Sequence, residues 1–318
     1  MTDQRNDMKE NEVASETTDA AVKGMKEKDI NAVSKKQLVV KILVQIGLYT
    51  FLTIMALAVL FPFYWMLISS VKTLDEYNAA NPTFWPQQFK WSNYSAAFTG
   101  ELNLGELFLN TVIIGVVSTL LSLVVTVLSA YAFARLEFKG KNALFAALLA
   151  TMMIPGELFT ITNYVTASRL GWVNSSWSFM ALIIPFLVSV FYIYLLRQNF
   201  MQIPNELYLA AKVDGTSDLK YLWKVMIPLA APTLISITIL KMMGAWNSYI
   251  WPRLVANNTM RLVTVGLRGA SFVDQATNMT DYPAQMAAVV IVTIPLLLVF
   301  MFFRKYIMRG VSRSGIKG

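Results

Sequence analysis

The sequence predicts an all-α integral membrane protein with six transmembrane helices. Hydrophobic residues make up 56% of the 318-residue chain and charged residues only 14%, which is far from the usage of soluble domains. The apolar residues also gather in runs longer than the roughly 20 residues needed to cross a ~30 Å hydrocarbon core. A third observation, the distribution of Lys and Arg, predicts the side of the membrane on which each loop lies.

Residues 1–38 differ from the rest of the chain. They are rich in Asp, Glu, Lys, Asn and Thr and hold few large apolar side chains, so they cannot bury enough surface to offset the entropy of ordering. We expect a disordered cytoplasmic tail here, followed by one six-helix transmembrane domain over residues 39–318. The tail is too long and too acidic for the start of a cleaved signal peptide.

The six crossings come from charge-poor segments. The stretch from Ile42 to Val71 and the one between Glu106 and Arg135 carry no charged residue at all. Of the other four, one contains only Glu157, one contains only Lys241, and two are charge-free. The expected crossings lie at about 43–70, 109–134, 143–167, 177–196, 226–250 and 284–303.

The basic residues set the orientation. If the N-terminus is cytoplasmic, the inside segments hold 20 of the 27 Lys and Arg residues, and the outside segments hold 6. Cytoplasmic loops carry such an excess in membrane proteins. We therefore expect both termini to lie in the cytoplasm. The net charge of +8 follows from topology, and no nucleic-acid partner is expected.

Several kinds of chemistry are excluded. The chain has no Cys and no His, so it offers no thiolate nucleophile, no imidazole base and no Cys/His metal site. It also has no Gly-x-x-x-x-Gly-Lys-Ser/Thr loop to hold nucleotide phosphates. We expect a transport subunit and not an enzyme, with no metal or cofactor of its own.

One polar segment, at about 203–218, interrupts the apolar sequence. Pro204 suits the first position of a helix, and Asn205 to Val213 can form about two and a half turns. Gly215 can adopt a positive φ and so reverse the chain, and Asp218 can begin a second helix. The sequence predicts a short helix, a sharp turn and a longer helix that re-enters the membrane.

This segment resembles the cytoplasmic coupling loop of ATP-binding-cassette importer permeases of the type I architecture. Ala210, Ala211, Asp214 and Gly215 fit the loop's pattern, as does the later Pro228, whereas Leu209 stands where the family usually has Glu. Glu206, one helical turn earlier, matches a Glu of the carbohydrate-importer versions. The resemblance implies that Glu206, Ala210, Ala211, Asp214 and Gly215 couple the chain to an ATPase. A surface connector between two crossings is the alternative.

The resemblance extends over most of the membrane region and is closest to the second permease of sugar importers. The matching segments follow one another in family order: 61–72, 84–86, 93–94, 110–111, 130–135, 153–155 and 246–252. The resemblance implies three kinds of partner besides membrane lipid: a related second permease, two ATPase subunits that hold ATP and Mg, and an extracytoplasmic sugar-binding protein. It also implies a place in the cytoplasmic membrane of a bacterium or archaeon.

Five residues are candidates for the substrate pathway. Glu157 and Lys241 are charges within apolar segments, where a charge is costly unless it faces protein or water. The alternative is that both lie near the outer boundary of the membrane. Trp246, Asn247 and Tyr249 end the fifth crossing with rings and an amide that suit a sugar, although aromatic residues also anchor helices at interfaces.

These observations predict a permease subunit that imports a carbohydrate, specifically an oligosaccharide, by alternating access at its interface with the second permease. An importer of the same architecture for a polyol, a glycerophosphodiester or an osmolyte is the nearest alternative. A gradient-driven secondary transporter belongs to another class, and it commonly shows internal repeats, which this chain lacks. A non-transporting scaffold would not need the coupling loop.

Overall fold

A computed structural model describes residues 35–99, 103–269, 272–273 and 279–312. The described elements are helical apart from one isolated pairing between Val273 and Thr280. The expected disordered tail falls mostly on residues 1–34, which lie outside the described residues. Helix α2 (Lys35–Ser69) begins immediately after them.

The chain divides into two units, residues 1–64 and 65–318. In the first unit, α2 is apolar around its whole circumference, and its side chains from Leu38 to Tyr64 are exposed. A helix of this composition is stable where lipid or another apolar surface surrounds it, because its backbone hydrogen bonds are all internal.

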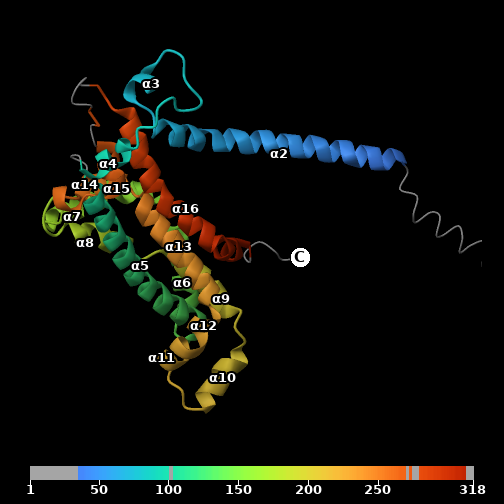
Figure 1. The fold of residues 1–318 in the computed structure, drawn as a ribbon. Helices are drawn as coiled ribbons and strands as arrows, with labels where there is room; N and C mark the ends of the chain where they lie inside the picture. Colours follow the sequence, from blue (N-terminus) through green and yellow to red (C-terminus); the bar gives the residue numbers. More distant parts are fainter. Residues whose placement is uncertain (1–34, 100–102, 270–271, 274–278, 313–318) are drawn as a thin grey trace, which may run out of the picture. The chain divides into compact units, whose positions relative to one another are not determined.

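The second unit is built on four packed helical segments, α5 (Leu104–Arg135), α9 (Val190–Met201), α13 (Ala231–Asn247) and α16 (Tyr282–Ser312) (Figure 1). Helix α5 packs against α9 and α13, and α13 also packs against α16. Small and hydroxyl side chains on α5, including Ser122, Thr126 and Ala130, are buried, which lets the helices approach closely.

Three of the six expected crossings are broken rather than straight. Helix α6 (Lys141–Thr151) meets η1 and α7 (Gly156–Phe159 and Thr160–Arg169) at 85°. Helices α8 and η2 (Ser178–Ile183 and Ile184–Phe186) meet α9 at 44°. The segment Asp218–Leu229, which contains α11, η3 and α12, meets α13 at 80°.

Proline explains where these breaks fall. Pro155 lies in the first break, Pro185 lies in η2, and Pro228 and Pro232 flank the third break at Ala230. Proline lacks an N–H and clashes with the preceding turn, so a helix bends or ends there. In the described part of the chain, three helices alone are long and apolar enough to span a membrane, or six spans result if each bent pair counts as one. The orientation of the spans stays a prediction.

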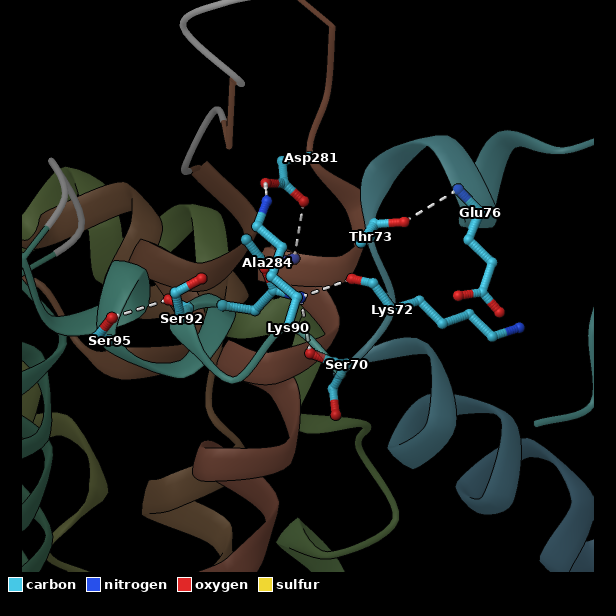
Figure 2. A network of polar contacts seen from close by, with 10 residues as sticks. Ser70, Lys72, Thr73, Glu76, Lys90, Ser92, Ser95, Asp281 and Ala284 are labelled. Atoms are coloured by element: carbon cyan, nitrogen blue, oxygen red, sulfur yellow. Dashed lines mark hydrogen bonds and ion pairs between the residues drawn. The ribbon is translucent and has the colours of Figure 1, made fainter. Parts of the chain in front are cut away.

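A polar network fixes the loop that follows α2 (Figure 2). The Asn93 amide donates to the carbonyls of Ser70 and Lys72 at 3.0 and 2.9 Å, and Lys90 lies 4.0 Å from Asp281 just before α16. The buried Lys72 ammonium donates to the Thr83 carbonyl and lies 4.7 Å from the centre of the Trp65 ring. This end of the unit also holds α3 (Leu74–Asn78) and α4 (Ser92–Thr99), which pack on α16.

Helix α14 (Ile250–Val255), η4 (Asn258–Met260) and α15 (Val263–Gly269) complete that end, and α15 packs on α5. The short helices α10 (Asn205–Val213) and α11 (Asp218–Tyr221) lie at the opposite end of the bundle (Figure 1). The two ends have separate cores. One joins α5, α9, α13 and the segment 221–230, and the other joins α5, α8, α14 and Leu262.

Candidate functional site

The helix and turn predicted at 205–215 are both present. Helix α10 covers Asn205–Val213, and Pro204 precedes it as its capping residue, one position earlier than expected. Gly215 has a φ of +67°. The N–H of Thr216 donates to the Ala211 carbonyl at 2.8 Å, and the N–H of Gly215 donates to the Lys212 carbonyl at 3.0 Å. This pair of bonds is a Schellman motif, which stops the helix and turns the chain.

The two alanines of this helix face opposite ways. Ala211, with Tyr208, packs against the core beneath α10, whereas Ala210 is exposed. Glu206 and Asp214 are exposed as well. Beside them lie three apolar side chains, Leu207, Leu209 and Val213, with exposed fractions of 44%, 56% and 89%. An amphipathic helix with its apolar side chains outward suits docking into a groove of a partner.

Asp218 is a hub that links this helix to the bundle. Its Oδ1 accepts hydrogen bonds from the hydroxyls of Tyr131 on α5 and Tyr208 on α10, at 3.1 and 3.0 Å, and lies 2.9 Å from the Lys212 ammonium. The hydrogen bond to Asp218 raises the pKa of the Lys212 ammonium above its ordinary value. From the sequence alone we expect only that Asp218 begins a second helix. The contact of Asp218 with Lys212 and its contact with Tyr131, 87 residues away, carry no sequence signal.

Arg135, the last residue of α5, makes a second link. Its guanidinium donates to the carbonyls of Phe200 and Ile203 at 3.0 and 2.5 Å, and to the side-chain oxygen of Asn205 at 3.2 Å. These acceptors lie at the end of α9 and the start of α10. The planar guanidinium satisfies several acceptors at once and so fixes α10 relative to α5 and α9.

A cavity of about 410 Å³ lies in the other half of the bundle. Its walls come from α5, the break between η2 and α9, the C-terminal half of α13, and α14. Four hydroxyl side chains line it, Ser118, Ser189, Tyr192 and Ser248, together with the rings of Phe186 and Trp251, which meet edge to face at 5.8 Å. Both the volume and the mixture of rings and hydroxyls are typical of small-molecule sites.

Lys241 is the one pathway candidate that lines this cavity. It lies ten residues into α13, about 15 Å from the start of the helix. Its ammonium donates to the Phe186 carbonyl at 2.5 Å, in the break of the fourth expected crossing. The side chain therefore bridges two walls of the cavity.

The other four candidates lie elsewhere. Trp246 is buried against Phe108 at 5.4 Å, and the Asn247 amide donates to the Met243 carbonyl on its own helix. Tyr249 lies beside the guanidinium groups of Arg253 and Arg268, and Glu157 is exposed in η1. The sequence predicts Asn247 near the end of one straight crossing at about 226–250. That geometry is wrong, because the chain bends at Ala230 and α13 itself is about 25 Å long.

Comparison with known proteins identifies this architecture. Residues 122–313 match the family model described as the binding-protein-dependent transport system inner membrane component. The arabinooligosaccharides transport system permease protein AraQ of Bacillus subtilis is 27% identical over 86% of this chain and 96% of its own length. The diacetylchitobiose uptake system permease protein NgcG of Streptomyces coelicolor is 30% identical over 84% and 87%.

A solved structure agrees with these matches. A chain of a bacterial ABC transporter that imports the acidic polysaccharide alginate has a TM-score of 0.75, with 25% identity over 83% of this chain and 96% of that one. The predicted permease fold is confirmed, and the chain is a multi-pass membrane protein and a transport subunit rather than an enzyme. The chain belongs to the family of binding-protein-dependent transport system inner membrane components.

Proposed function

We propose that this chain is the second permease of a carbohydrate importer in the cytoplasmic membrane of a bacterium or archaeon. It pairs with a related permease, two ATPase subunits and an extracytoplasmic binding protein, and the ATPases hold ATP and Mg. The observation that carries the proposal is α10, whose exposed apolar side chains project from the bundle while Asp218 and Arg135 tie it to the spans. The sugar-transporting relatives support a saccharide as cargo.

In this proposal, α10 receives the movement of the ATPase. Leu207, Leu209 and Val213 fill a groove of the ATPase, so Leu209 contributes apolar contact at the position where the coupling-loop pattern usually has Glu. Glu206 and Asp214 add charged contacts at the two ends of α10, and the small Ala210 permits close approach. The Schellman turn at Gly215 keeps the C-terminal end of α10 folded when the ATPase moves it.

The movement then reaches the bundle through Asp218 and Arg135. Asp218 connects α10 to Tyr131 in the middle of a buried core, and Arg135 connects it to the end of α9. Because α9 begins just after the cavity's broken wall at Ser189, a displacement of α9 changes the cavity's shape. Packed cores respond by switching between discrete arrangements, which is the behaviour that alternating access requires.

Reconstitution tests the proposal directly. The complete complex is placed in lipid vesicles with its binding protein and a mixture of labelled oligosaccharides. We expect uptake that requires ATP, fails with a non-hydrolysable ATP analogue and is unaffected by ionophores that dissipate ion gradients. Uptake that continues without ATP and collapses with an ionophore would instead indicate a gradient-driven transporter.

The orientation of the chain yields a separate prediction. Because the chain has no native Cys, single Cys residues at Lys220 and Asn258 report topology cleanly. Both side chains are exposed. Asn258 is chosen over the neighbouring Asn257 because the Asn257 side chain caps η4, and its replacement would disturb that turn. With an impermeant thiol reagent added to intact cells, we expect position 258 to be labelled and position 220 to be labelled only after permeabilisation. The reverse pattern would invert the orientation.

The link through Asp218 can be tested by a double-mutant cycle. Tyr131→Phe and Asp218→Asn should each lower ATP-driven uptake several-fold, because each weakens the contact between α10 and α5. If that contact transmits the movement, the double variant should be little worse than Asp218→Asn alone, since both changes remove the same bond. Tyr194→Phe is the matched control and should leave uptake unchanged. If the losses of uptake in the two single variants simply add in the double variant, the link is contradicted.

A further inference from the structure

The cavity carries an unbalanced positive charge. Among the residues that line it, Lys241 is the one that is charged. In the described part of the chain, no carboxylate lies within 4.0 Å of its ammonium. The Phe186 carbonyl accepts one hydrogen bond, but a carbonyl is a neutral dipole, and an ammonium has three N–H donors.

An unpaired cation at this depth is expensive. Charged side chains within membrane-spanning segments normally pair with an opposite charge or face a site where a ligand or ion passes. A methionine or glutamine at position 241 would fill similar space at a lower cost of desolvation. The hydrogen bond to the Phe186 carbonyl therefore does not by itself explain why a charged residue stands at position 241.

The segment next to the cavity is also positively charged. Residues 248–269 contribute Ser248, Trp251 and Leu262 to the cavity wall, and they contain three Arg residues and no Asp or Glu. Arg253 and Arg268 are exposed and flank the Tyr249 ring, with guanidinium carbons 5.7 and 4.4 Å from its centre. Guanidinium groups are well suited to carboxylate and phosphate groups, which they bind through paired hydrogen bonds.

We propose that this cavity takes a saccharide that carries a negative charge, a carboxylate or a phosphate, and that Lys241 sets this selectivity. The inference rests on the proposed function as a saccharide importer. The ammonium pairs with the anionic group while the four hydroxyls and the rings of Phe186 and Trp251 contact the sugar. The arginines of residues 248–269 raise the local concentration of anionic cargo beside the cavity.

The first test is the charge of the cargo. Cells that carry the complete importer are offered labelled neutral disaccharides, uronic-acid disaccharides and sugar phosphates in equal amounts, and the imported sugars are identified by mass spectrometry. We expect a uronic acid or a sugar phosphate to enter in preference to neutral sugars, and the separate arms show which anion is taken. Import of neutral sugars alone would overturn the inference but uphold the proposed function. Import of no sugar would overturn both.

The second test separates selectivity from structure. Lys241→Gln keeps an N–H donor for the Phe186 carbonyl but removes the charge. It should lower import of the anionic cargo about tenfold or more, the size expected for losing a charged hydrogen bond. Lys241→Arg should keep most of the import. Lys139→Gln, at an exposed loop position, is the control and should behave as wild type.

The ratio between cargoes is the decisive readout. If Lys241 selects charge, Lys241→Gln should reduce stimulation of ATP hydrolysis by the anionic sugar while stimulation by its neutral analogue is unchanged or higher. If Lys241 only holds the helix break together, the Gln variant should keep wild-type import of the anionic cargo. That result, or an equal loss with both cargoes, would overturn the proposal.

Discussion

Gly215→Val is expected to abolish sugar uptake while the complex still assembles in the membrane. Gly215 has a φ of +67°, a conformation that costs a side-chain-bearing residue about 1–2 kcal/mol, and more when the side chain is β-branched. No atom lies within 4 Å of the position a Cβ would take, so the penalty is one of backbone conformation rather than of collision. The turn relieves it by opening the Schellman motif, and α10 then loses its fixed relation to Asp218.

Comparison with Gly215→Asn makes this prediction specific. Asn tolerates a positive φ, so this variant should keep most of the uptake although its side chain is about as large as that of Val. Uptake is measured in vesicles, with assembly checked by co-purification of the ATPase. Normal uptake by a well-assembled Gly215→Val complex would contradict a coupling role for this turn.

Arg135→Met should cause the largest loss of stability. The change removes the guanidinium that donates to the carbonyls of Phe200 and Ile203. The Phe200 carbonyl keeps the N–H of Ile203, so the partly buried Ile203 carbonyl is the acceptor that loses its donor. An unsatisfied buried acceptor costs about 1–3 kcal/mol, so a loss of that size is expected. Since α9 and α10 both lose their attachment to α5, the thermal unfolding temperature of the purified complex and its yield from the membrane should both fall.

A charge control accompanies this variant. Arg304→Met removes the same charge from an exposed position on α16 and should leave the unfolding temperature nearly unchanged. Arg135→Lys should be intermediate, because one ammonium cannot reproduce the planar fork. An unfolding temperature for Arg135→Met within a degree of the wild-type value would show that water replaces the guanidinium at no cost.

The features predicted from sequence were the local ones. The ends of α10 follow from Pro204 and from Gly215, which adopts the expected positive φ. The three helix breaks were not predicted, and only the structure shows that they fall at Pro155, Pro185 and Pro228. The sizes of the bends do not follow, because they depend on how distant helices pack. The contacts of Lys241 with Phe186 and of Asp218 with Tyr131 join residues 55 and 87 positions apart, and no local pattern encodes them.

The environments of the aromatic pathway candidates also depend on residues that are distant in the sequence. Trp246 and Tyr249 are three residues apart in a segment that suits either a sugar platform or an interfacial anchor. In the structure one ring is packed in the core and the other lies between two arginines. The choice between these environments is made by Phe108, Arg253 and Arg268, so composition alone cannot decide it.

The separate cores at the two ends of the bundle have an evolutionary consequence. Substitutions around Lys241 act on the core that joins α8 and α14, whereas substitutions around Asp218 act on the core that holds α11. Tyr192 packs on one core and lines the cavity, but side chains that contact only one core change the free energy additively with distant side chains of the other. A lineage can therefore alter which saccharide passes by changing a few side chains at one end, without having to adjust α10 and its contacts at the other end.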